Sequence, residues 1–260
     1  MNALAARIAG IGFWCDGLPD WAAARAFVRD GSLPADAPRR PSPRLLAPNE
    51  RRRAPETVAV ALEVALAACN DAGIDPATLP GVFVATHGEL SITDYMGSTL
   101  AGDPLAMSPT RFHNSVHNAA AGYWTIGSGC HAPATALSAW HASFAQGLLE
   151  ALVQLADGAP AVLLAAYDGT APGPLAEVAP STGLLGAALV LARGGDGITL
   201  AARLVEGEAA PGDGPLAAHA AGNAMATMLP LFDALARAAA GPVMLPAGPG
   251  LTLQVELAHG

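Results

Sequence analysis

Apolar residues recur along this chain with two different periods, which predicts a mixture of helices and strands. In residues 56–72 Val58, Leu62 and Cys69 fall on one helical stripe, and Gly73 is the expected C-cap. Apolar runs without alternation, such as residues 81–88, indicate strands buried on both faces. The predicted strands are 4–13, 81–88, 134–140, 161–167, 183–193, 198–209, 242–246 and 251–257. The predicted helices are 21–29, 56–72, 92–101, 142–156 and 223–240, with another helix in the polar stretch after Ser108.

The order of these elements predicts a layered α/β fold, a mixed sheet with helices on both faces. Strand 134–140, helix 142–156 and strand 161–167 form a right-handed crossover unit. The runs 183–193 and 198–209, joined by the turn GGDG, predict an antiparallel hairpin. Because no repeat or linker divides the chain, we expect one domain over residues 1–260.

Composition and charge narrow the range of functions. Hydrophobic residues make up 52% of the chain but aromatic ones only 5%, so the core is expected to pack by close backbone approach. The net charge of -9 argues against binding to nucleic acid. Six of the thirteen basic residues lie between Arg39 and Arg53; this segment is either a solvated surface or a basic patch for an acidic partner. Without a membrane-length apolar run or a signal peptide, the chain is expected to be cytoplasmic.

The densest polar cluster comprises His113, Asn114, His117 and Asn118. Two histidines spaced i, i+4 on a helix suit a shared metal. Asn114 stands where a zincin would need a glutamate, and no third ligand is marked, so no metal is expected. A structural hydrogen-bond network of these four side chains is the preferred interpretation.

Candidate nucleophiles are few. His141 lies at the turn between strand 134–140 and helix 142–156, a helix N-terminus of the kind that often carries a nucleophile. Cys130 lies in the loop GSGCHAP before that strand. With Cys15 and Cys69 it makes three scattered cysteines, which indicate neither a disulfide framework nor a metal site. Neither a phosphate loop nor a dinucleotide fingerprint is present, so no cofactor is expected.

The segment SPTRFHNSVHNAAAGYWTI, followed by APATALSAWHASFAQGLLEAL, resembles the N-terminal half of a β-ketoacyl synthase of the thiolase-like fold. Pro133 and Thr135 match the Pro and Thr of that family's Gly-Pro-x-Thr motif. Ala142 and Ser143 match the Ala-Ser that follows its active cysteine. His141 stands at the position of the cysteine itself. The resemblance covers residues 4–191, and residues 192–260 would complete the core with a hairpin strand, a helix and terminal strands.

The resemblance implies that this chain does not catalyse condensation alone. An imidazole cannot hold an acyl chain as a thioester, and the family's histidine motifs His-Gly-Thr and Asn-x-Phe-Gly do not occur. In pattern the chain is most similar to chain length factors of aryl polyene and xanthomonadin-type pigment clusters. It would then form a heterodimer with a ketosynthase, meet the acyl carrier protein only indirectly, and bind neither nucleic acid nor membrane.

By the same resemblance, the strand that bears Thr135, Leu137 and Trp140 would face the ketosynthase. The residues that would gate the shared acyl tunnel are Ile92, Tyr95, Met96 and Thr99, for which core packing is the alternative. Two other functions stay open: an acyltransferase or decarboxylase that uses His141, and a stand-alone acyl-binding scaffold. Because half a ketosynthase would expose an apolar face, we expect helix 223–240 to fold back over it, with the final strands as an edge.

Overall fold

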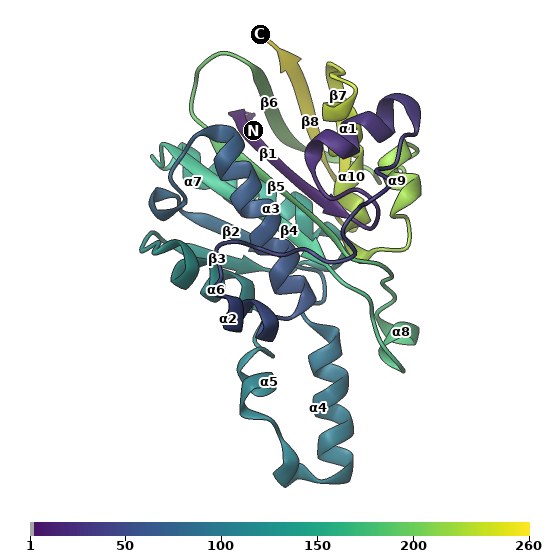
Figure 1. Cartoon of the computed structure of the whole chain (residues 1–260). Coiled ribbons are helices and arrows are strands. Elements are labelled where there is room, and N and C mark those ends of the chain that lie inside the picture. Colours follow the sequence, from purple (N-terminus) through teal and green to yellow (C-terminus); the bar gives the residue numbers. More distant parts are fainter. Residues whose placement is uncertain (1–2) are drawn as a thin grey trace.

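The protein is built on an eight-stranded mixed sheet with strand order β3-β2-β4-β5-β1-β6-β8-β7 (Figure 1). The computed structural model describes residues 3–260. β2 runs parallel to β3 and β4, and all other neighbouring strands are antiparallel. The strands are β1 (Leu4–Cys15), β2 (Gly81–Val84), β3 (Ala134–Leu137), β4 (Ala161–Asp168), β5 (Leu185–Ala192), β6 (Ile198–Glu206), β7 (Gly241–Gly248) and β8 (Leu251–His259). The predicted mixed sheet is confirmed.

Helices cover both faces of the sheet, as predicted, and each face has its own buried core. On one face α3 and α6 contribute Val64 and Trp124. On the other face α7 and α10 contribute Phe144 and Phe232, whose ring centroids lie 6.1 Å apart. The helices are α1 (Trp21–Asp30), α2 (Pro48–Arg53), α3 (Glu56–Ala72), α4 (Leu90–Gly102), α5 (Pro109–His113), α6 (Ala119–Ser128), α7 (Ser143–Ala156), α8 (Leu175–Val178), α9 (Pro215–His219) and α10 (Leu229–Ala236). None of the helices within residues 3–260 has both the length and the apolar character of a membrane span.

β1 and α3 approach each other closely because two glycines remove the side chains between them. A Cβ atom on Gly12 would lie 2.0 Å from the carbonyl oxygen of Val64. A Cβ atom on Gly10 would lie 2.2 Å from the carbonyl oxygen of Ala68. Since even one methyl group does not fit, these glycines set the distance between the helix and the sheet. The expected packing by close backbone approach is confirmed here.

Both ends of α1 and the end of α3 are set by cap residues, and the predicted C-cap Gly73 is confirmed. The Asp20 side chain accepts a hydrogen bond from the backbone N–H of Ala23 at 2.8 Å and begins α1. Gly31 ends α1 and Gly73 ends α3, both in the left-handed conformation that glycine adopts without strain.

The predicted hairpin of β5 and β6 is wrong, because β1 lies between them. Arg7 of β1 is opposite Ala192 of β5 on one side and opposite Thr199 of β6 on the other. The Arg7 Nε donates to the carbonyl of Gly194 at 2.9 Å, where the connecting turn crosses β1. A buried strand must pair its backbone N–H and C=O groups on both of its edges. β1 does so by lying between β5 and β6 and pairing with one of them on each edge.

Three predicted elements are shorter than expected. The helix expected after Ser108 is two helices, α5 and α6, because α5 ends at His113 and the chain turns through residues 114–118. β2 ends at Val84 and β3 ends at Leu137, before turns that carry polar side chains. The crossover from β3 through α7 to β4 passes over β2, which pairs with both strands.

The C-terminal segment covers the sheet as expected, although it is not one helix. It consists of a 3₁₀ helix, η4 (Ala224–Met228), and α10, which begins at Leu229 with Pro230 in its first turn. Met225, Met228 and Leu231 are fully buried in the core beside α7. β7 forms the far edge of the sheet, which confirms the expected edge.

α4 and α5 form an arm that projects from the body of the molecule (Figure 1). α4 begins at Leu90, two residues before the predicted start at residue 92, and its N-cap is Glu89. The Glu89 side chain accepts from the backbone N–H of Ser91 and from the Thr57 hydroxyl, at 3.2 and 2.6 Å. The second bond ties the base of the arm to α3.

Candidate functional site

Polar side chains join the carboxyl ends of the three parallel strands. Asp168, the last residue of β4, accepts hydrogen bonds from the backbone N–H groups of Thr86 and His87 after β2, at 2.8 and 3.2 Å. Ser138, just after β3, donates to the carbonyl of Thr86 at 2.9 Å. Ligand sites of α/β sheets commonly lie beyond this end of parallel strands. We therefore locate the candidate site here.

Asp168 is a buried carboxyl group, 1% exposed. Burial raises its pKa to about 6, although the N–H groups of Thr86 and His87 favour the ionised form. The protonation of Asp168 is therefore coupled to folding of the turn after β2. Asp168 was not among the predicted site residues, and its signal in the sequence is a carboxyl group directly after the apolar run of β4.

The turn between β3 and α7 is held in a strained conformation. It is a 3₁₀ turn, η3 (Trp140–Ala142), and Trp140 has a φ of +55°, a left-handed value that costs a non-glycine residue about 1–2 kcal/mol. The buried Ser143 hydroxyl donates to the carbonyl of Trp140 at 2.6 Å and accepts from the N–H of Ala139 at 2.9 Å. The serine of the Ala-Ser motif thus holds the turn in place.

Two imidazoles and an indole cluster on this turn. The rings of His87 and His141 both meet Trp140 edge to face, with centroids 5.2 and 5.3 Å away. Partial burial lowers the pKa of His87, and the nearby His141 lowers it further. His141 and Trp140 are exposed. The surface therefore presents a histidine where the resemblance implies a thiol.

No cysteine within residues 3–260 takes over the role of that thiol. Burial raises the pKa of Cys15 and Cys69 to about 12, so both stay protonated at neutral pH. Cys130 is buried and donates to the carbonyl of Leu79 at 3.3 Å. It precedes β3, whereas His141 follows that strand, so the two lie at opposite ends of β3.

The polar cluster of residues 113–118 does not form one network in the part of the chain that the structure describes. His113 ends α5, whereas His117 lies in the following turn, where its Nε2 is 3.2 Å from the carbonyl of Ala85. Asn114 is buried with its Oδ1 unpaired, and Asn118 precedes α6 without a side-chain cap bond. The expected i, i+4 pair on a single helix is wrong, because α5 ends at the first histidine. No group of three possible metal ligands occurs within residues 3–260.

The four tunnel candidates lie on α4 and differ in their surroundings. Ile92 is buried, and Met96 and Thr99 are partly exposed. The Tyr95 hydroxyl accepts from the N–H of Ser108 at 2.8 Å, and its ring lies 4.2 Å below the Arg111 guanidinium. Tyr95 therefore fastens α4 to the returning half of the arm.

β3 leaves one edge of the sheet free. The carbonyls of Pro133 and Leu137 accept bonds from Gly81 and Ala85 on the β2 side. Because backbone direction alternates along a strand, the N–H and C=O groups of Ala136 point outward. No strand within residues 3–260 pairs with this outer edge.

The side chains expected at the partner interface divide into two groups. Thr135 and Leu137 are partly buried on the α7 side, where the Thr135 hydroxyl accepts from Gln154 at 3.4 Å. Trp140 is 51% exposed at the end of the strand. At this edge, therefore, backbone groups and one indole are available to a partner.

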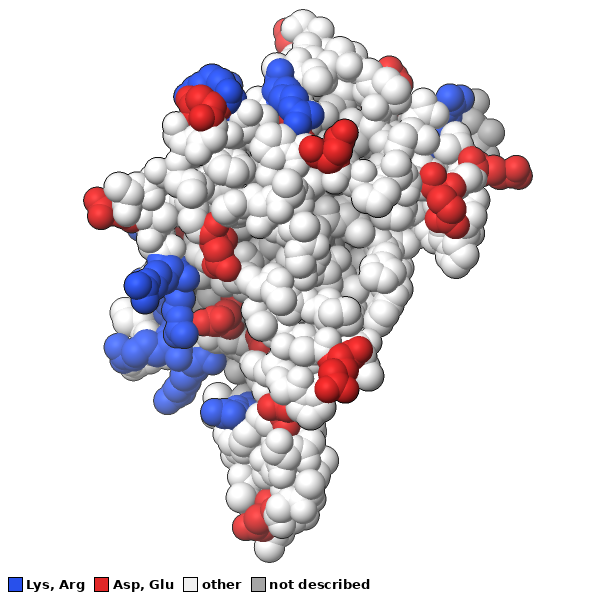
Figure 2. Space-filling view, turned by 90° about the vertical axis from the view of Figure 1, so that its right-hand side faces the viewer, with Lys and Arg blue, Asp and Glu red and all other residues white. Residues whose placement is uncertain are grey.

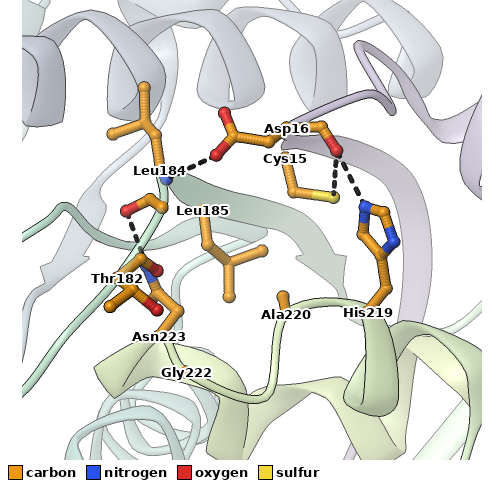
Figure 3. Close-up of a pocket in the computed structure, with 10 residues that line it drawn as sticks. Cys15, Asp16, Thr182, Leu184, Leu185, His219, Ala220, Gly222 and Asn223 are labelled. Atoms are coloured by element: carbon orange, nitrogen blue, oxygen red, sulfur yellow. Dashed lines mark hydrogen bonds between the residues drawn. The ribbon is translucent and has the colours of Figure 1, made fainter.

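A pocket of about 270 Å³ lies where the C-terminal segment meets the end of β1 (Figure 3). Asn223 holds this junction: its Nδ2 lies 3.2–3.3 Å from the carbonyls of Asp168, Thr182 and Gly183. Its Oδ1 accepts from the N–H of Met225 at 2.9 Å, which starts η4. Asn223 was not among the predicted site residues, since the three carbonyls that it bonds lie at least 40 residues away along the chain. Asn223 thus ties the C-terminal segment to the strand end that carries Asp168.

A family model described as "Beta-ketoacyl synthase, N-terminal domain" matches residues 21–241. A search of curated proteins gives no match. One similar solved structure is a ketosynthase (ApeO) in complex with its chain length factor (ApeC) from Xenorhabdus doucetiae. That match has a TM-score of 0.76 and 22% identity, and it covers 97% of this chain and 99% of the other.

Two further complexes have similar folds. The ishigamide ketosynthase/chain length factor matches with a TM-score of 0.72 and 17% identity, over 98% of this chain and 99% of the other. AntDE:AntF, a type II carrier protein in complex with its ketosynthase, matches with a TM-score of 0.74 and 12% identity, over the full length of both chains. At these identities the likeness establishes the fold, which is the thiolase-like layered fold.

Proposed function

This chain belongs to the family of β-ketoacyl synthase N-terminal domains, and we propose that it acts as a non-catalytic, chain-length-factor-like partner of a ketosynthase subunit. The heterodimer would build fatty acyl or polyketide chains of the aryl polyene type, with the acyl carrier protein meeting mainly the ketosynthase. In this role the chain helps to shape the tunnel that receives the growing acyl chain.

The observation that carries the proposal is the free edge of β3 beside a turn that has no thiol. An unpaired strand edge is a template for another strand, so it is normally covered or blocked. Trp140 stands exposed at its end, and indoles are common anchors of protein interfaces. A second subunit that adds a strand to β3 would satisfy the outward groups of Ala136 and cover Trp140.

Co-expression with a neighbouring ketosynthase, followed by gel filtration with light scattering, tests this pairing. Ala136→Pro removes an outward N–H but no hydrogen bond to β2, whereas Ala136→Ser keeps the N–H and is the matched control. We expect the natural chain and the Ser variant to form the heterodimer and the Pro variant to elute alone with an unchanged circular dichroism spectrum. A natural chain that elutes alone beside a folded ketosynthase would refute the proposal.

Among the tunnel candidates, Met96 is the one to test. Tyr95 fastens the two halves of the arm and Ile92 is buried, so a change at either would disturb the local structure of the arm. Met96 is partly exposed on the same helix face, where an indole in its place would narrow a shared tunnel. We expect Met96→Trp to shorten the products of the complex and Met96→Ala to leave them the same or longer, as measured by mass spectrometry.

One observation favours a second function, acid–base chemistry by His141 in acyl transfer or decarboxylation. The ring of His141 is exposed and meets the Trp140 indole edge to face. Histidine side chains are common general acids and bases in enzymes. The His141→Ala variant, assayed with the ketosynthase present, separates the two functions. Unchanged turnover supports the non-catalytic role, and a loss of about 100-fold or more would support the enzyme.

A further inference from the structure

Three rings form a continuous surface just beyond the end of β3. The ring of His141, in the turn after that strand, and the ring of His87, in the turn after β2, both meet the Trp140 indole edge to face. β2 pairs with β3, so the two turns that carry the imidazoles are neighbours. Trp140 and His141 are exposed and His87 is partly exposed. We call these three side chains the imidazole–indole cluster.

The cluster is continuous with the free edge of β3. Ala136, whose N–H and C=O groups point outward from that edge, lies four residues before Trp140. A partner subunit that adds a strand to this edge and covers the exposed indole also removes water from the two imidazoles that contact it. The protonation of these imidazoles is therefore coupled to the covering of the edge.

We propose that His87 and His141 belong to the pairing surface and enter it as neutral imidazoles, so that pairing weakens as the pH falls from about 8 to about 5.5. The partner is the ketosynthase of the proposed function, on which this inference rests. The partner surface that fits the cluster is uncharged, with apolar side chains against the indole. Carboxylates at that place would favour the charged rings instead and give the opposite pH dependence.

The free chain already disfavours a charged ring at His87. Partial burial lowers the pKa of His87, and the neighbouring His141 lowers it further, so both causes oppose the protonated form. A covering subunit increases the burial of both rings. Two imidazolium ions against one indole would then repel each other in surroundings that screen charge less than water does. Pairing therefore favours the state in which both rings are neutral.

Asp168 is the buried carboxyl group that faces this turn from β4. It accepts from the backbone N–H groups of Thr86 and His87. Burial raises its pKa to about 6, so it loses its negative charge over the pH range in which imidazoles gain protons. Asp168 therefore does not compensate imidazolium ions at low pH. Its own contribution to the stability of the fold increases as the pH falls, so it does not unfold the chain there.

The other charged groups near the turn after β2 do not favour imidazolium ions either. The Glu89 carboxylate, two residues after His87, accepts from the Thr57 hydroxyl at 2.6 Å and is committed to the base of the arm. His117 is a third imidazole, with its Nε2 3.2 Å from the carbonyl of Ala85. Figure 2 shows basic side chains gathered on one side of the body, just above the arm, and acidic side chains scattered over the rest of that face. Positive charge gathered beside the base of the arm disfavours further cations.

The dissociation constant of the heterodimer at two pH values tests the proposal. Heterodimer from co-expression is labelled and diluted in series at about pH 8 and about pH 5.5, and fluorescence-detected sedimentation velocity gives the constant at each pH. The test variant is His87→Gln with His141→Gln, because glutamine is polar and does not titrate. The matched control is His219→Gln with His259→Gln, the same change at exposed positions on α9 and β8. Circular dichroism at both pH values checks that each chain is folded.

An imidazole of ordinary pKa, about 6.5, that must lose its proton to enter an interface weakens binding about tenfold at about pH 5.5. We therefore expect the dissociation constant of the natural chain and of the control to rise about tenfold or more between the two pH values, and that of the test variant to rise less than about threefold. Because burial already lowers the pKa of His87, His141→Gln alone should remove more of the pH dependence than His87→Gln alone. Titration of the ketosynthase itself affects every chain equally.

Two results would overturn the inference and leave the proposed function intact. One is an equal pH dependence in the natural chain and in the test variant, and the other is tighter pairing at low pH. A natural chain that pairs at neither pH would refute the proposed function, and the inference with it. If the double variant does not fold, His141→Gln alone decides, because that position is exposed and the change leaves the buried core untouched.

Discussion

Replacement of the buried Asp168 by Asn should remove a pH dependence from the stability of the fold. The carboxyl is 1% exposed and its pKa is about 6, against an ordinary value of 3.8. Because the folded pKa is raised, the stabilising contribution of Asp168 is fully present below pH 4. It is lost as the pH rises through 6.

The size of this effect on the free energy of unfolding follows from the shift in the pKa of Asp168. About two pKa units at about 1.4 kcal/mol each correspond to roughly 3 kcal/mol between the protonated and the ionised limits. An Asn side chain has the shape of the protonated Asp and does not titrate. The variant should therefore gain about 3 kcal/mol relative to the natural chain as the pH rises from 4 to above 6, whatever its absolute stability.

Urea denaturation followed by circular dichroism, at several pH values across this window, measures the difference. Asp196→Asn, an exposed carboxyl in the turn between β5 and β6, controls for the loss of one charge. A difference between Asp168→Asn and the natural chain that stays within about 1 kcal/mol over the whole window would refute the reasoning.

Three further changes test how the site is supported. Asn223→Ala should destabilise the protein by about 2–3 kcal/mol, seen as a lower melting temperature, because it frees the N–H of Met225 and removes the donor shared by the carbonyls of Asp168, Thr182 and Gly183. A loss below about 0.5 kcal/mol would contradict its role. Tyr95→Phe removes the bond to Ser108 and should speed proteolysis between α4 and α5 without changing the global melting temperature by more than about 3 °C. Gly12→Val should prevent folding or cost about 3 kcal/mol or more, because a Cβ already overlaps the Val64 carbonyl, and a normal melting curve would show that α3 can shift.

The sequence predicted best those elements whose boundaries are encoded locally. Asp20 begins α1, Gly31 ends α1 and Gly73 ends α3, and each of these cap residues lies directly beside the boundary that it sets. The predicted helix 223–240 failed even though a local signal was available, since Pro230 marks the start of a new helix. The predicted hairpin of β5 and β6 is wrong because the pairing of strands depends on contacts across the whole sheet, which a local sequence pattern does not encode.

The same distinction applies to the candidate site. The turn at His141 was found because its motif is contiguous in the sequence. The bonds from Asp168 to Thr86 and His87 span 82 and 81 residues, and no periodicity connects such positions. The left-handed conformation of Trp140 could not be predicted from the sequence either. Tryptophan has no preference for that conformation, and the hydrogen bond from Ser143 holds the residue in it.

The two edges of the sheet differ in how readily they could accept another strand. β7 contains Pro242 and Pro246, and proline has no N–H to give to the neighbouring β8. Both prolines therefore occupy positions whose backbone nitrogens face away from β8, where they block the addition of another strand. β3 has no proline between Ala134 and Leu137, so its outward groups stay free to pair. The blocked edge at β7 and the open edge at β3, beside the exposed Trp140, support the proposal that a partner strand adds to β3.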